Sequence, residues 1–215
     1  MLLNIHTHNS SPNETGIINI LKDFENVPAT GYYSAGIHPW YISKESWRAA
    51  FQSLKALVQQ RHILAVGECG LDTVCETDYS LQQDCFREQI RLANSVNKPL
   101  LIHCVKAYEN TMHLLTAVPV RVPVIFHGFN KNAGLATQLL KAGYYLSFGK
   151  HLLQPAAAAV FQSTPVNRLF LETDAAAISI ETIYEAAAAI KKCTVTELAK
   201  QVGANATELF GINFN

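Results

Sequence analysis

The sequence predicts an α/β protein, specifically a (β/α)8 TIM-type barrel whose first units are trimmed. Eight short apolar, β-rich runs recur along the 215-residue chain. They are continuous rather than alternating in polarity, as parallel strands buried on both faces are. Helical patterns lie between many of these runs, and repeated β-then-α units are typical of barrels. An open doubly wound sheet is the alternative fold.

The expected strands share apolar and β-branched or aromatic side chains. They cover residues 2–6, 16–21, 32–38, 63–68, 99–103, 122–127, 144–148 and 169–174. A complete barrel of this type has about 250 residues. The segment between His8 and Tyr32 can hold one strand but not two crossover helices. We therefore expect the first units to be reduced to loops or single turns.

Two helices have recognisable starts. Ser80-Leu-Gln-Gln83 resembles a capping box, and the helix that follows is expected to end at Asn97 and Pro99. Thr194-Val-Thr-Glu197 suggests a second capped helix that reaches Val202. Further helices are expected over residues 45–60, 107–117, 132–141, 155–162 and 181–192. Because no linker interrupts this series, we expect a single domain over residues 1–215.

The composition is that of an ordinary folded protein, with 49% apolar and 16% charged residues. Lys plus Arg and Asp plus Glu each total 17, so the basic excess required for tight duplex binding is lacking. Five scattered cysteines, an odd number, fit reduced thiols in a cytosol. No segment approaches the ~18 apolar residues of a membrane span. We therefore expect a cytoplasmic protein with neither a membrane partner nor an obligate protein partner.

Polar, chemically active side chains stand at the C-terminal ends of the expected strands. They are His6 with His8, His38, Glu68, His103, His127 and Asp174. A barrel gathers these strand ends around one mouth, so we expect the side chains to converge. His6 and His8 are two residues apart on an extended backbone and therefore point the same way. This arrangement lets both imidazoles bind one cation.

The residue types at the strand ends indicate which metals would bind. Imidazole and carboxylate together suit zinc, manganese, iron or nickel, whereas a dedicated calcium site would have an oxygen shell. Burying Glu68 and Asp174 without a counter-charge costs several kcal/mol per ion by order of magnitude, and a cation removes that penalty. The sequence therefore predicts one or two transition-type ions. His62 and His113 end no apolar strand, and we interpret them as structural or surface residues.

The motifs that contain these residues resemble the TatD-type metal-dependent hydrolases, a branch of the amidohydrolase-like barrels. The resemblance covers nearly the whole chain through "NIHTH" at 4–8, "GIHPW" at 36–40, "GECGLD" at 67–72, "PLLIHC" at 99–104, "FHGF" at 126–129, "LETDA" at 171–175 and "NATELFG" at 205–211. It implies two divalent ions, with zinc, manganese, magnesium, iron and nickel not distinguished. The ligands it implies are His6, His8, Glu68, His103, His127 and Asp174. By the same resemblance, Glu68 bridges the ions and Asp174 also orients the attacking water.

The resemblance further implies a deoxyribonuclease or phosphodiesterase, acting on short or single-stranded DNA ends or on a small phosphoester. Candidate substrate contacts are His38 for the scissile phosphate or leaving group, Lys106 or Lys150 for positive charge, and His151 on a loop near the expected mouth. The chain departs from the family pattern at Asn4, where Asp is common, and at Lys106, where Arg is common. The alternatives are an amide, lactone or phosphomonoester hydrolase of the same superfamily, and a metal-binding protein without turnover.

Overall fold

The structure is a computed structural model that describes residues 2–9 and 15–214. The described residues form eight strands: β1 (Leu3–Thr7), β2 (Thr15–Ile20), β3 (Tyr32–Ala35), β4 (Ile63–Asp72), β5 (Leu100–Val105), β6 (Val124–Phe126), β7 (Tyr145–Phe148) and β8 (Leu169–Leu171). Their order in the sheet follows their order in the chain. The ladders β1–β2, β3–β4, β4–β5, β6–β7 and β7–β8 are all parallel. All eight predicted strands are confirmed.

The helices also lie where the sequence places them. They are α1 (Trp47–Leu57), α2 (Tyr79–Val96), α3 (Tyr108–Ala117), α4 (Ala133–Lys141), α5 (Pro155–Ser163), α6 (Ile180–Lys191) and α7 (Val195–Phe210), with short 3-10 helices η1 (Pro39–Tyr41), η2 (Lys150–Leu153) and η3 (Val166–Arg168). Residues 21–31, between β2 and β3, form no helix, as the trimmed first units predict. Residues 10–14, between β1 and β2, lie outside the described residues.

Two helix ends differ from the predictions. Helix α2 is capped by Asp78, whose Oδ1 accepts a hydrogen bond from the Leu81 amide at 3.0 Å, so Ser80 lies inside the first turn and is not the cap. The capping box at Thr194 is confirmed, but α7 continues beyond Val202 to Phe210. Asn205 explains the extra length, because its Nδ2 donates to the carbonyl oxygens of Val166 and Leu169 and fastens this part of the helix.

Three strand ends also differ. Strand β3 ends at Ala35, because the chain turns at His38 to begin η1. Strand β8 ends at Leu171, and Asp174 has a positive φ of 54° that ends the extended backbone. Strand β4 instead continues past Glu68 to Asp72. The polar residues at these positions are therefore held partly by loops and not by strands alone.

The chain forms two compact units. Unit 1 contains residues up to 18 and from 125 onward, and unit 2 contains residues 19–124. The boundaries fall within β2 and within β6. The single domain over residues 1–215 stays a prediction.

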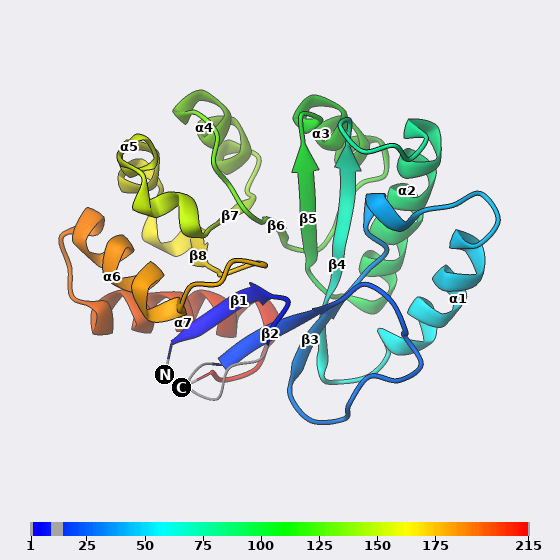
Figure 1. The fold of residues 1–215 in the computed structure, drawn as a ribbon, viewed down its shortest axis with the longest axis horizontal. Helices are drawn as coiled ribbons and strands as arrows, with labels where there is room; N and C mark the ends of the chain where they lie inside the picture. Colours follow the sequence, from blue (N-terminus) through cyan, green and yellow to red (C-terminus); the bar gives the residue numbers. More distant parts are fainter. Residues whose placement is uncertain (1, 10–14, 215) are drawn as a thin grey trace. The chain divides into compact units, whose positions relative to one another are not determined.

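Unit 2 is built around β3, β4 and β5. In Figure 1 the strands β4 and β5 run side by side with α2 beside them. The core of this unit is largely apolar, with Val66, Leu71, Phe86, Ile90 and Ile102 all at 0% exposure. Burying side chains of this size contributes about 1.5–3 kcal/mol each. The apolar core therefore fixes the strands whose polar residues form one part of the candidate site.

Unit 1 joins the N-terminal strand to the C-terminal part of the chain. A parallel bridge pairs Thr7 with Asp174 and so sets β1 beside the segment that follows β8. The hydroxyl of Tyr184 in α6 donates to the Leu3 carbonyl at 3.0 Å and ties β1 to that helix. The core of this unit is rich in buried aromatic rings, including Phe148 and Phe161, whose centroids lie 4.9 Å apart. Among the described residues, no helix is long and apolar enough to cross a membrane.

Candidate metal centre

Four predicted ligands come together in unit 1. His6, His127 and Asp174 each offer a ligand atom, and these atoms all lie within 4.8 Å of one another. Asp174 Oδ1 lies 3.5 Å from His6 Nε2 and 3.3 Å from His8 Nε2. The rings of His6 and His127 have centroids 4.4 Å apart. Residues from β1, from just after β6 and from just after β8 thus form one cluster, as parallel strand ends allow.

The backbone of β1 and of the segment after β8 holds this cluster in place. The Asp174 amide donates to the His6 carbonyl at 3.0 Å, and the His8 amide donates to the Asp174 carbonyl at 3.3 Å. Beside them, Asn4 Nδ2 donates to Thr173 Oγ1 at 2.8 Å, and the Thr173 amide donates to Asn4 Oδ1 at 3.1 Å. Asn4 is buried, so a satisfied amide pair suits this position. The neutral side chain at position 4 therefore has a structural role in joining the two segments.

The charge of Asp174 is stabilised by the imidazoles around it. Partial burial by itself raises the pKa of this carboxyl, but hydrogen bonds from His6 and His8 and the proximity of His127 hold the pKa well below its usual range. A carboxylate whose charged form accepts several hydrogen bonds stays ionised at neutral pH. The side chain is also 42% exposed. Asp174 therefore presents an ionised, solvent-accessible oxygen to the cluster.

Glu172 is a candidate positioning residue that the sequence interpretation missed. It is fully buried, and its Oε1 accepts a hydrogen bond from the Gly128 amide at 2.7 Å and lies 3.3 Å from His127 Nδ1. A carboxylate behind a ligating imidazole fixes the ring and its tautomer. Because this contact engages Nδ1, a metal would be bound by His127 through Nε2. The sequence could have indicated this role, because Glu172 stands in the apolar run that begins at Leu169 and a buried carboxylate needs a hydrogen-bond or charge partner.

Truncating Glu172 tests this positioning role. Because Glu172→Ala removes the group that orients His127, we expect the zinc affinity of the protein to fall about 10- to 100-fold. Glu172→Gln keeps an acceptor for the Gly128 amide and should lose much less. Zinc affinity is measured by chelator competition, with the exposed Glu185→Ala as the matched control. Equal affinities for Glu172→Ala and the control would contradict the role.

A second cluster lies in unit 2. His38, Glu68 and His103 offer ligand atoms that also lie within 4.8 Å of one another. Glu68 Oε1 is 3.2 Å from His38 Nε2 and 2.9 Å from His103 Nδ1. Glu68 Oε2 accepts a hydrogen bond from Asn19 Nδ2 at 2.9 Å, and the Glu68 amide donates back to Asn19 Oδ1 at 3.0 Å. His38, predicted as a substrate contact, is thus placed among possible metal ligands.

Asp72 extends this second cluster. Its Oδ2 lies 3.2 Å from His103 Nε2 and accepts a hydrogen bond from Trp40 Nε1 at 2.7 Å. Burial raises the pKa of Asp72, but the hydrogen bonds from Trp40 and the Val74 amide, together with His103, leave the pKa below its ordinary value. Gln82 holds the backbone of Asp72 at both its amide and its carbonyl. Asp72 is therefore an ionised group that orients His103.

Strand β5 approaches β4 closely beside this cluster, and a glycine makes the approach possible. Gly70 has a φ of +144°, and a Cβ at this position would lie 2.0 Å from the carbonyl oxygen of His103. Gly70 and His103 are also register partners in the β4–β5 ladder. No side chain fits at this spacing. The backbone of His103 can therefore occupy its position only because residue 70 is a glycine and has no side chain.

The other predicted substrate contacts lie elsewhere. Lys106 is exposed directly after β5 and has a φ of 52°. His151 lies in η2 and not in an irregular loop, and it lines a small cavity of about 80 Å³ with Phe129 and Phe148. Their contact with substrate stays a prediction.

The donor sets of both clusters fit divalent transition ions. Imidazole nitrogens combine with carboxylate oxygens in each, and the carboxylate of Glu68 is buried among histidines. His6, His8, His127 and Asp174 could hold an ion in unit 1, and Glu68 and His103, with His38, could hold one in unit 2. That all six predicted ligands share one pair of ions stays a prediction.

Comparisons with known proteins agree with these features. Residues 3–211 match the family described as TatD related DNase. The chain is 32% identical over 173 residues to an uncharacterized metal-dependent hydrolase of Buchnera aphidicola, covering 75% of the chain and 64% of that protein. It is 30% identical over 150 residues to the 3'-5' ssDNA/RNA exonuclease TatD of Enterobacter lignolyticus, covering 66% of the chain and 56% of that protein. The chain thus spans less than two thirds of the length of each of these relatives.

A solved structure supports the fold. The crystal structure of YjjV, a TatD homologue from Escherichia coli K12, superposes with a TM-score of 0.85 at 20% sequence identity and covers 98% of both chains. This likeness, together with the eight strands in chain order, confirms the predicted (β/α)8 TIM-type barrel fold. At this level of identity it bears on the fold alone.

Proposed function

The chain belongs to the TatD-related DNase family, and from this premise we propose that it is a divalent-metal-dependent hydrolase of phosphodiester bonds. The substrate class we propose is the end of a short or single-stranded nucleic acid, because a relative 30% identical to the chain is named a 3'-5' ssDNA/RNA exonuclease. The observation that carries the proposal is the pair of histidine–carboxylate clusters, which have the donor types of catalytic transition-metal sites.

The residues of the two clusters would have different roles in hydrolysis. Divalent ions held there would supply Lewis acidity and lower the pKa of water toward neutrality. Asp174, ionised and partly exposed, is suited to orient the attacking water by accepting a hydrogen bond from it. Glu68, whose two oxygens face different partners, is suited to bridge two ions. His6, His8, His103 and His127 would complete the ligand set.

Positive charge for the substrate phosphate would come from a lysine. Lys106 is exposed directly after the strand that carries His103. An ammonium at this position would pair with a phosphate oxygen as a point charge. The neutral overall charge of the chain agrees with a local phosphate contact and not with a long duplex-binding surface.

A substrate panel tests the proposed function. The protein is stripped with a chelator, reloaded separately with manganese, zinc, magnesium and nickel, and given single-stranded DNA and RNA, duplex DNA, bis(p-nitrophenyl) phosphate and a simple lactone. We expect hydrolysis of the phosphodiesters, preference for single strands, and loss of activity after chelation. No turnover of any phosphodiester with any metal would overturn the proposal and favour a metal-binding protein, while turnover of the lactone alone would favour the carbonyl hydrolase alternative.

A further inference from the structure

Two aromatic rings are exposed beside the unit 2 cluster. Trp40 is 57% exposed and Tyr41 is 42% exposed, although both are large and apolar. They lie in η1 directly after His38, whose ring centroid is 5.0 Å from that of Trp40 and 5.8 Å from that of Tyr41. Exposed aromatic side chains next to a polar cluster are typical of a surface that binds a ligand.

Hydrogen bonds fix the indole ring of Trp40 in the absence of a ligand. Its Nε1 donates to Asp72 Oδ2 at 2.7 Å, and its backbone amide donates to His38 Nδ1 at 3.2 Å. Asp72 Oδ2 in turn lies 3.2 Å from His103 Nε2. These bonds fix the indole to the cluster and leave more than half of it in solvent. A ring ordered in this way loses little conformational entropy when a flat group stacks on it.

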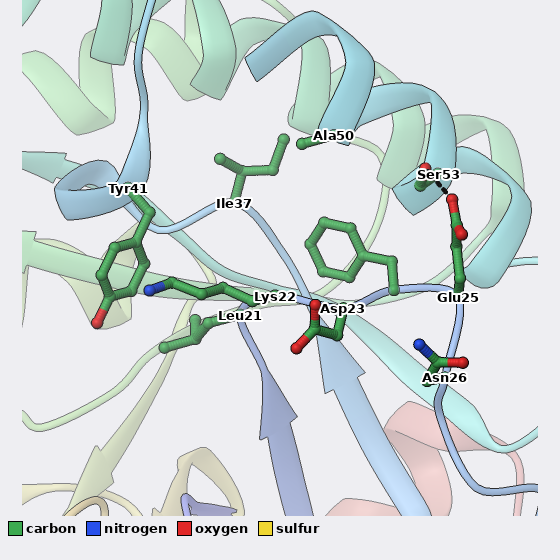
Figure 2. A pocket seen from close by; sticks show the side chains of 10 residues that line it. Leu21, Lys22, Asp23, Glu25, Asn26, Ile37, Tyr41, Ala50 and Ser53 are labelled. Carbon is green, nitrogen blue, oxygen red and sulfur yellow. Dashed lines mark hydrogen bonds between the residues drawn. The ribbon is translucent and has the colours of Figure 1, made fainter. Parts of the chain in front are cut away.

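A cation lies against the second ring. Lys22 follows the last residue of β2 by two positions, and its Nζ lies 4.0 Å from the centroid of the Tyr41 ring. Figure 2 shows the ammonium group pointing toward Tyr41 along one side of a hollow. The side chain of Lys22 is exposed, so the ammonium is accessible to an anion. A positive charge and an aromatic face thus stand together beside the cluster.

The hollow in Figure 2 has room for a flat apolar group. Its volume is about 490 Å³, and Tyr41, Phe24, Ile37 and Ala50 line it. Asp23 and Glu25 also line it and are exposed, which disfavours an anion inside the hollow. A ligand with a phosphate beside a flat ring therefore fits best with its phosphate at Lys22 and its ring against the aromatic side chains.

We propose that Trp40, Tyr41 and Lys22 form a subsite for the nucleotide next to the scissile phosphate of a single-stranded nucleic acid. The base of this nucleotide stacks on the aromatic rings, and its phosphate pairs with Lys22. This proposal rests on the proposed function and names how that site selects its substrate class. Stacking tolerates any base sequence, and in a duplex the base is already stacked on its neighbours. The subsite therefore selects single strands without selecting a sequence.

Binding to the metal-free protein tests the subsite without turnover. The chain contains two tryptophans, and Trp47 is only 4% exposed, so quenching of tryptophan fluorescence by oligothymidylate reports on Trp40. We expect quenching in the wild type and none in Trp40→Phe. By fluorescence anisotropy, Trp40→Ala should raise the Kd for a labelled oligothymidylate about tenfold, and Trp40→Phe about threefold or less, because a phenyl ring still stacks.

Lysine variants test the phosphate contact. Lys22→Gln should weaken binding and lower the dependence of log Kd on log salt by about 0.7, the contribution of one phosphate contact on a single strand. Lys44→Gln, an exposed lysine a few residues beyond η1, is the matched control and should leave both quantities unchanged. Wild-type Kd values in both Trp40→Ala and Lys22→Gln would overturn the subsite.

An abasic substrate separates failure of the subsite from failure of the proposed function. With metal-loaded wild type, removing the base next to the scissile phosphate should raise KM about tenfold and leave kcat unchanged. In Trp40→Ala, KM should already be raised and should not respond to the missing base. Equal KM for intact and abasic strands in the wild type would overturn the subsite alone. Absence of all hydrolysis would overturn the proposed function, and the binding measurements would still decide the subsite.

Discussion

Glu68→Gln is expected to lower kcat/KM for a phosphodiester by about a thousandfold, comparable with the loss of a group that stabilises charge in a transition state. Glu68 is buried, and its Oε1 lies within 3.2 Å of ring nitrogens of both His38 and His103. Glutamine keeps the size of the side chain but lacks the negative charge that would hold a cation among these imidazoles. The same change should reduce the metal content per chain after dialysis.

The measurement compares kcat/KM and bound metal in the wild type and the variant at saturating manganese or zinc. Circular dichroism establishes that the variant is folded. Glu45→Gln, which removes an exposed carboxylate from the same unit, is the matched control and should change neither quantity. Full catalytic activity in Glu68→Gln would refute the bridging role and remove the main support for metal-dependent hydrolysis.

Gly70→Ala is expected to destabilise the protein by about 3 kcal/mol or more, in the range of severe backbone and packing changes. A Cβ at this position would lie 2.0 Å from the His103 carbonyl oxygen, so β4 and β5 would have to separate. Because His103 moves with that carbonyl, we also expect weaker metal binding. The free energy of unfolding is measured by denaturant titration of the metal-free protein.

Gly143→Ala isolates the steric part of this effect. Gly143 also has a positive φ, of +86°, but no atom lies within 4 Å of the Cβ that alanine would add. The loss of unfolding free energy in Gly143→Ala therefore measures the backbone strain alone, which is about 1 kcal/mol. Similar losses in the two variants would show that the close approach of β4 and β5 contributes nothing to stability, contrary to the expectation.

Sequence reasoning worked where strand pattern and ligand chemistry pointed to the same positions. His6 and His8 end a continuous apolar run, and their spacing of two already indicated a shared direction. The structure places His6 with His127 and Asp174 in one cluster, as the convergence of parallel strand ends predicts. Long-range proximity was predictable here because the fold class could be inferred from the order of the elements.

The missed features depend on contacts that periodicity does not encode. The strand that begins at Ile63 was expected to end at Glu68. In the structure Gly70 is needed for the approach to β5, and the strand continues to Asp72. That Asp72 orients His103 follows from its contacts with Trp40 and His103, which the sequence pattern does not indicate. Likewise, His38 was assigned to substrate because nothing in its motif shows the distance to Glu68.

The bonds between Asn4 and Thr173 join residues 169 positions apart, and this separation orders events during protein synthesis. The first strand leaves the ribosome long before its partner segment exists. Residues 19–124, in contrast, are a contiguous stretch that is complete much earlier. Native pairing of His6 and His8 with Asp174 must therefore wait until Asp174 has been synthesised, well after residues 19–124 are complete.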